Sequence, residues 1–177
     1  MIQSHPKHFR ILAIAPSTRG FGFVVLEREE TLVDWGGKSV KGDKNAQCLT
    51  KVDEMIAHYQ PGVMVLQDCS GKNSRRSARI QKLSQQIVAL ASRRKVNVKL
   101  FSKEQVKRVF FTEREGTKHA LAEILAKRFP EEFGSRLPPK RRPWMSEDSR
   151  MDIFDAVSLA LAFRARKGSA SFRHGQS

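Results

Sequence analysis

Apolar residues form short runs in the first half of the chain and recur at helical spacing in the second half. The runs over 10–16 (RILAIAP), 20–27 (GFGFVVLE) and 31–35 (TLVDW) predict three strands, and Gly36-Gly37 closes the third. Two later runs, 63–67 (VMVLQ) and 96–101 (VNVKLF), predict two further strands. The first run alternates too little for an exposed strand, so we expect it to be buried on both faces.

Apolar residues three and four positions apart predict helices between and after these strands. The first helix has one apolar face, made by Ala46, Leu49, Val52, Ile56 and Tyr59, and ends before Pro61-Gly62. Later helices are predicted over about 74–94, 102–110, 117–128 and 150–166. Ser102 and Gln105 have the spacing of a capping box, and residues 129–149 form a Pro- and Arg-rich connection.

The predicted order is βββαβαβααα, which has three consecutive strands and then strands that alternate with helices. This order is typical of an α/β fold with a five-stranded mixed sheet, made of an antiparallel three-strand meander plus parallel strands and flanked by helices. We expect a flexible N-terminus over 1–9, one domain over 10–166, and a disordered basic and polar tail over 167–177.

The charge of the chain indicates its kind of partner. Its 177 residues include 33 Lys and Arg against 18 Asp and Glu, a net charge of +15. Such an excess favours a polyanion, and nucleic acid is the most common one. The two cysteines lack metal-site spacing, and no apolar run suits a membrane span or a secretion signal. We therefore expect a cytoplasmic, nucleoid-associated protein without a membrane or small-molecule partner.

Three acids are candidates for metal chemistry. Asp152 and Asp155 share one face at the start of the last helix, where either the helix dipole or a bound Mg²⁺ or Mn²⁺ would stabilise them. Asp68 follows a buried strand, where it is either a third ligand or a loop-start acid. Neighbouring strand residues point to opposite faces, so Gln67 and Asp68 should not both face one site.

Four segments together resemble the RuvC-type Holliday-junction resolvases of the RNase H-like superfamily. They are ILAIAPSTRGFGFVV, PGVMVLQD, KEQVKRVF and DIFDAVSLALAF, and the resemblance covers about residues 10–165. It implies an RNase H-like fold, a homodimer, and metal-dependent cleavage of four-way DNA in recombination and repair.

The resemblance also indicates where this chain departs from the family. Four acids hold two Mg²⁺ ions in these resolvases, and Asp152 and Asp155 match the last two. Ala15 and Gln67 stand at the other two positions. The resemblance therefore implies that Asp152 and Asp155 are catalytic and metal-binding residues, and Asp68, which stands next to Gln67 at the strand end, is the candidate third ligand. With two of the four acids replaced, we expect Mg²⁺ or Mn²⁺ to bind weakly and cleavage to be doubtful.

Basic residues supply the expected DNA contacts. By resemblance, Lys107 and Lys118 match lysines that approach the scissile phosphate or the junction arms. The remaining candidates stand at the first turn, around the second helix and beside Trp144: Arg19, Arg75, Arg76, Arg79, Lys140, Arg141 and Arg142. For any one of them, a solvated surface position is the alternative.

The leading hypothesis is a protein that binds branched DNA. One alternative is a nuclease whose metals are held by Asp68, Asp152 and Asp155. Others are a catalytically inactive DNA- or RNA-binding module of the same fold and a small nucleotide-binding domain of the actin and sugar-kinase type.

Overall fold

The computed structural model describes residues 8–71, 75–112 and 116–173, and the side chains of 168–173 are not included. Its centre is a five-stranded sheet made of β1 (Arg10–Pro16), β2 (Gly20–Glu27), β3 (Thr31–Ser39), β4 (Val63–Gln67) and β5 (Asn97–Phe101). The strand order is β3-β2-β1-β4-β5. The pairs β1–β2 and β2–β3 are antiparallel, while β1–β4 and β4–β5 are parallel, so the predicted mixed sheet is confirmed.

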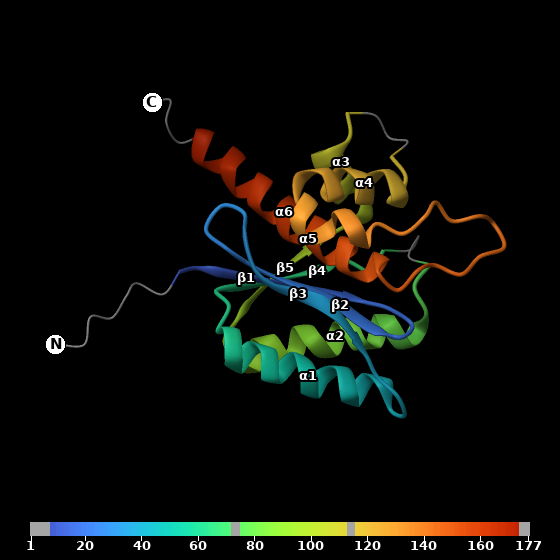
Figure 1. The fold of residues 1–177 in the computed structure, drawn as a ribbon. Helices are drawn as coiled ribbons and strands as arrows, with labels where there is room; N and C mark the ends of the chain where they lie inside the picture. Colours follow the sequence, from blue (N-terminus) through green and yellow to red (C-terminus); the bar gives the residue numbers. More distant parts are fainter. Residues whose placement is uncertain (1–7, 72–74, 113–115, 174–177) are drawn as a thin grey trace.

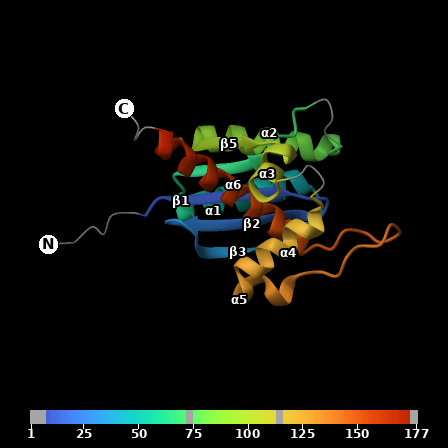
Figure 2. The ribbon, with the colours of Figure 1, turned by 90° about the horizontal axis from the view of Figure 1, so that it is seen from above.

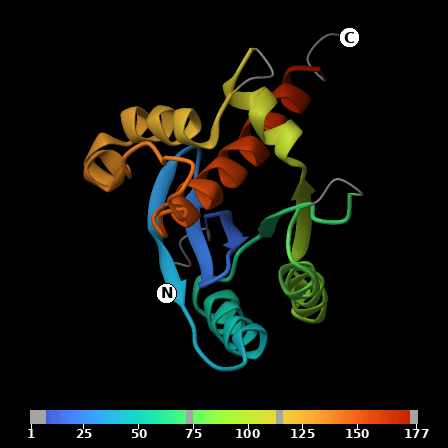
Figure 3. The same ribbon diagram turned by 90° about the vertical axis from the view of Figure 1, so that its right-hand side faces the viewer.

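The central strand β1 is buried on both faces because helices cover both sides of the sheet. Its residues alternate between two apolar clusters, with Leu12 and Ile14 on one face and Ile11, Ala13 and Ala15 on the other. The first face carries α1 (Lys44–Tyr59) and α2 (Ala78–Arg93). The second carries α3 (Lys103–Phe110), α4 (Lys118–Arg128) and α6 (Met151–Arg173), as Figures 1 and 3 show.

Side-chain caps begin four of these helices. Asp43, Ser77, Ser102 and Thr117 each accept a hydrogen bond from the backbone N–H three residues later. The capping box predicted for Ser102 and Gln105 is confirmed, because the Gln105 side chain accepts from the Ser102 backbone N–H at 2.8 Å. This box fixes where α3 leaves the end of β5.

Several predicted boundaries were wrong. Strand β3 continues through Gly36 and Gly37, which pair with Phe23 and Gly22 of β2 instead of forming a turn. The connection over 129–149 contains α5 (Pro130–Phe133) and the 3₁₀ helix η1 (Gly134–Arg136), and Pro130 starts α5. Helix α2 begins at Ala78, after its Ser77 cap.

Helix α6 is longer than the sequence predicts. It runs to Arg173, whereas the pattern of apolar residues predicts an end near 166 and a tail beyond it. Small and basic residues are compatible with helix when no Pro or Gly pair stops it, and Lys167 stands over the rings of Phe9 and Phe163. Most of the predicted N-terminal segment and residues 174–177 lie outside the described residues.

The structure assigns the chain to the α/β class that the sequence predicts. None of its helices, within the described ranges, has the length and apolar character needed to cross a lipid bilayer.

Candidate functional site

A pocket of about 300 Å³ opens where the carboxyl ends of β1 and β4 meet α3, α4 and α6. This edge is where ligand sites gather in open α/β sheets. We call it the central pocket, and its lining residues are Ala15, Gln67, Lys103, Val106, Lys107, Thr117, Lys118, Leu121, Asp155, Ser158 and Leu159.

Helix α6 reaches the pocket because a glycine lets it approach the sheet closely. Gly22 pairs with Ala15 across β1 and β2. A Cβ at Gly22 would lie 2.1 Å from the backbone oxygen of Asp152. Figure 2 shows α6 crossing the sheet with α3 and α4 beside it. The first turns of α6 therefore lie against the end of β1, and Asp155 lines the same pocket as Ala15 and Gln67.

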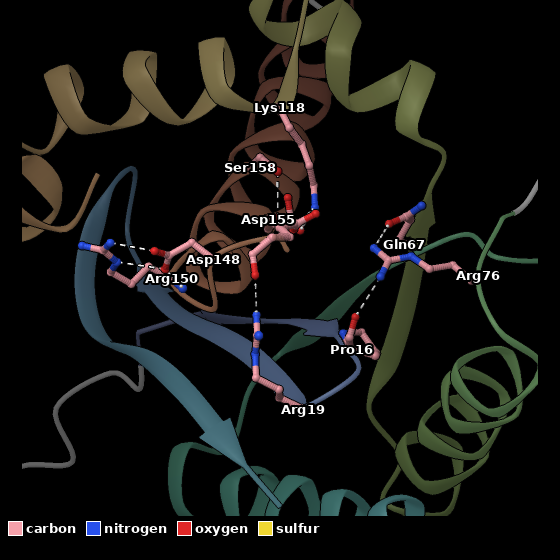
Figure 4. A network of polar contacts seen from close by, with 10 residues as sticks. Pro16, Arg19, Gln67, Arg76, Lys118, Asp148, Arg150, Asp155 and Ser158 are labelled. Carbon is pink, nitrogen blue, oxygen red and sulfur yellow. Dashed lines mark hydrogen bonds and ion pairs between the residues drawn. The ribbon is translucent and has the colours of Figure 1, made fainter. Parts of the chain in front are cut away.

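Asp155 is paired with a lysine. Its Oδ2 lies 2.9 Å from Nζ of Lys118 (Figure 4). Lys118 also contacts a carboxylate oxygen of Glu147. Burial raises the pKa of Asp155, and the Lys118 ammonium opposes that rise. Burial alone would lower the pKa of Lys118, but Asp155 and Glu147 together hold it above its usual value. A cation of the protein itself thus neutralises the Asp155 carboxylate.

Asp152 lies outside the pocket lining, between α6 and the sheet, and is only 8% exposed. Burial raises its pKa, and the nearby Asp155 adds to the rise, while Ser17, Arg19 and Lys118 act in the opposite direction. One turn earlier, Asp148 makes a two-pronged hydrogen bond with Arg150, which lowers the pKa of Asp148 to about 2. Asp148 and Arg150 fix the start of α6.

Gln67 points into the central pocket, but its oxygen is already engaged. Arg76 donates to Gln67 Oε1 at 3.0 Å and to the backbone oxygen of Pro16 at 3.2 Å (Figure 4). Arg79 donates to the backbone oxygen of Ser17 at 3.2 Å and to Asn45 at 3.1 Å. These two arginines, predicted as DNA contacts, hold the turn between β1 and β2.

Asp68 does not join the other two acids. Its Oδ1 accepts hydrogen bonds from the Ser70 backbone N–H at 2.9 Å and the Ser70 hydroxyl at 2.6 Å, and these bonds lower its pKa. It lines a second, smaller pocket with Arg75. Within the described ranges, no three Asp, Glu, His or Cys side chains are arranged to hold a metal ion. Asp68 thus takes the place of a loop-start acid and lines a different pocket from Asp155. The catalytic and metal-binding roles of Asp68, Asp152 and Asp155 stay predictions.

The other predicted DNA contacts lie on different elements. Lys107 lines the central pocket, and Arg75 is exposed beside the second pocket. Arg19 is exposed and donates to the backbone oxygen of Glu147 at 3.0 Å. Lys140, Arg141 and Arg142 are exposed on the segment before α6. Their role in binding stays a prediction.

Sequence reasoning missed two residues of the site. Lys103 is the first residue of α3 and lines the central pocket; burial, Arg76 and Lys118 lower its pKa. Glu147 is the second partner of Lys118. The capping box at Ser102 places Lys103 at the carboxyl end of β5, and that signal could have identified it. No local pattern indicates the pairing of Glu147.

Comparisons with known proteins indicate the fold. No protein-family model matches the chain, and no curated protein matches it. A Thermus thermophilus RuvC structure matches with a TM-score of 0.64 at 18% identity, covering 90% of this chain and 97% of RuvC. The T. thermophilus RuvC in complex with a Holliday junction substrate gives 0.62 at 18% identity, with 91% and 97% covered.

A third solved structure agrees with these two. The yeast mitochondrial Holliday junction resolvase Ydc2 matches with a TM-score of 0.57 at 13% identity, covering 96% of this chain and 82% of Ydc2. All three matches span most of both chains, and the strand order and helix placement agree with the resemblance in the sequence. The chain therefore has the RuvC-type, RNase H-like fold.

Proposed function

We propose that this protein binds branched DNA, with four-way junctions as the preferred form, and that it binds without cutting. The fold it shares with RuvC, including RuvC in complex with a Holliday junction substrate, supports the choice of partner. The net charge of +15 supports a polyanion. Binding without cleavage rests on the central pocket.

The single observation that carries the proposal is the charge of the central pocket. Three lysines, Lys103, Lys107 and Lys118, line it, against one carboxylate, that of Asp155. Neither Lys103 nor Lys107 forms an ion pair within the described part of the chain. A pocket with this balance favours an anion, and a DNA phosphate is the anion that suits the rest of the surface.

The residues of the pocket do not fit the divalent metal that the resemblance implies. Ala15 offers no ligand atom, and the Gln67 oxygen accepts from Arg76. The Asp155 carboxylate is paired with Lys118 at 2.9 Å. A dication bound to Asp155 would lie a few ångströms from an ammonium group, and that repulsion opposes binding. We therefore derive no metal-dependent step for this chain.

The test compares labelled four-way junctions with linear duplex of the same sequence, in EDTA and in Mg²⁺. We expect tighter binding to the junction than to the duplex in both buffers, so that Mg²⁺ is not required for binding. A structured RNA competitor tests the alternative of an RNA-binding module. Equal affinity for junction and duplex would remove the preference for branched DNA, and stronger competition by RNA would favour the RNA module.

Cleavage is measured on the same junctions with Mn²⁺ or Mg²⁺, at protein concentrations that saturate binding. We expect no nicking above an EDTA control. Nicking that depends on Asp155 would instead favour the nuclease.

The homodimer that the resemblance implies also stays a prediction. Equilibrium sedimentation of the protein alone measures its oligomeric state.

A further inference from the structure

The segment over 137–150, between η1 and α6, carries an exposed tryptophan. We call it the Trp144 loop, and Figures 1 and 2 show it projecting beyond the end of the sheet. Trp144 is 75% exposed and its neighbour Met145 is 42% exposed. The other tryptophan, Trp35, packs edge-on against Phe133 with ring centroids 5.8 Å apart. A large aromatic ring left in water favours contact with a partner.

Backbone contacts hold the tip of the loop in one shape. The Met145 N–H donates to the Arg142 oxygen at 3.0 Å, and Arg141 Nε donates to the Met145 oxygen. The Arg142 guanidinium stands over the Trp144 ring, 5.6 Å from its centre. The ring is therefore presented on a formed turn, which lowers the entropy lost when it binds.

The base of the loop is tied to the central pocket. Arg19 donates to the Glu147 backbone oxygen at 3.0 Å, and the Glu147 carboxylate pairs with Lys118. Lys118 in turn pairs with Asp155 inside the pocket. Trp144 therefore stands on a loop whose base contacts a residue that lines the central pocket.

The charge around Trp144 favours nucleic acid as its partner. Lys140, Arg141 and Arg142 are exposed, and none of them forms an ion pair among the described residues. Cations beside a bare aromatic ring suit nucleic acid, since the cations contact phosphates and the ring stacks on a base. A ring can stack only on a base whose face is not covered by a neighbouring base. Within a duplex all faces are covered, and a face becomes free where the two strands separate.

We propose that Trp144 stacks on an unstacked base where strands part, and so contributes to the choice of branched over linear DNA. This inference rests on the proposed function for the junction, but stacking itself can be measured on single strands. The occupant is a nucleobase, and a protein partner is an outcome that the test can reveal.

Fluorescence tests the contact directly because the chain has two tryptophans. The Trp35→Phe variant leaves Trp144 as its only tryptophan. We expect its emission to be quenched by single-stranded DNA and by a four-way junction, and not by a long, fully paired linear duplex. Unchanged emission with single strands and junctions, under conditions where anisotropy shows binding, would overturn the proposal.

Affinity gives a second measurement. We expect Trp144→Ala to weaken binding to junctions and single strands roughly tenfold, with little change for fully paired linear duplex. Trp144→Phe should keep most of the affinity. The matched control is Lys140→Ala, which should weaken all three forms. It should lower the salt slope by about 0.9 for the junction and the duplex and by about 0.7 for single strands. An equal loss for all forms in Trp144→Ala would overturn base stacking.

These outcomes separate this inference from the proposed function. Quenching by single strands together with equal affinity for junction and duplex would support stacking by Trp144. It would contradict both the role of Trp144 in selecting branched DNA and the proposed preference for four-way junctions. If Trp144→Ala changes the sedimentation of the protein alone and leaves every DNA affinity unchanged, the ring contacts a second copy of the chain and the inference is wrong. Because Trp144 is 75% exposed, the variant should keep the wild-type circular dichroism and Tm.

Discussion

Lys118 decides the chemistry of the site at the scale of single residues. Its ammonium contacts both Asp155 and Glu147, and so joins α6 and the Trp144 loop to α4. A largely buried carboxylate such as that of Asp155 needs a cation close to it, and here that cation is the Lys118 ammonium. The pocket therefore keeps a carboxylate and leaves it no free charge for a metal.

Removal of the Lys118 ammonium should lower the free energy of unfolding, because Asp155 is then buried without its cation. We expect Lys118→Met to lower the free energy of unfolding by about 1–2 kcal/mol, because the pair is only partly exposed and its loss leaves two carboxylates without a partner. Asp155→Asn in the same background should recover part of that loss. Chemical denaturation measures both, and the control is Lys107→Met, which lines the same pocket without an ion pair. Equal losses for the two methionine variants would contradict this role of the pair.

Asp152 should make stability depend on pH in a defined direction. Its pKa is raised in the folded protein, so the folded state holds a proton over a range where the unfolded state has lost it. Its charged form therefore lowers stability at neutral pH, and this effect disappears as the pH falls through the folded pKa toward about 3.9. We expect Asp152→Asn to raise the Tm at pH 7, with the gain vanishing near pH 4.

The control for that variant has the opposite sign. Asp53 makes a two-pronged contact with Arg94 at 2.7 Å, which lowers the pKa of Asp53. Its stabilising effect is present above the unfolded pKa and is lost as the pH falls through the lowered folded pKa. Asp53→Asn should therefore lower the Tm at pH 7. A lower Tm for both variants at pH 7 would show that Asp152 has a partner that stabilises its charge.

The approach of α6 to β2 is the decisive contact at the scale of elements. We expect Gly22→Val to cost about 3 kcal/mol, since its side chain would overlap the backbone of Asp152 and force α6 away from the sheet. The control is Gly37→Val in β3, which is paired with Gly22 and has open space around its Cβ. Thermal unfolding compares them, and equal Tm values would mean that α6 adjusts without strain.

Introducing acids at the ends of β1 and β4 tests whether the residues now present prevent a divalent metal from binding. We expect the triple variant Ala15→Asp, Gln67→Glu, Lys118→Ala to bind Mn²⁺ in calorimetry, because it surrounds Asp155 with carboxylates and removes the competing ammonium. The control carries Ala15→Asn and Lys118→Ala, which add no negative charge to the strand ends. Binding of Mn²⁺ by the wild-type protein with similar affinity would contradict the view that its pocket does not suit a divalent metal.

The helices and strands of this fold can be predicted from local sequence patterns, while the side-chain contacts within the site cannot. The apolar runs over 10–16 and 63–67 predict β1 and β4, and the spacing of Ser102 and Gln105 predicts the start of α3. Gly36-Gly37 was mistaken for a turn because pairing with β2, a contact distant in sequence, keeps these glycines extended. The partners of Lys118 and Arg76 are likewise tertiary, so neither the ion pair nor the occupied Gln67 could be predicted.

At the scale of the whole molecule, a net charge of +15 predicts binding that depends strongly on salt. We expect junction affinity to fall about 10³-fold between ~50 and ~200 mM salt if six or so phosphates are contacted. Variants separate the cations: Lys140→Ala should lower the salt slope by about 0.9, and Arg79→Gln should leave the slope unchanged because Arg79 binds the first turn. Equal slopes for the two variants would contradict this division.

The turn after β1 is held by side chains that bond to its backbone. Lys44, Arg76 and Arg79 hold it through the backbone oxygens of Thr18, Pro16 and Ser17, at 2.7 Å, 3.2 Å and 3.2 Å. Peptide oxygens are present whatever side chains the turn carries. These contacts thus do not depend on the side chain of residue 15, and a substitution there that fits the central pocket should leave the turn in place.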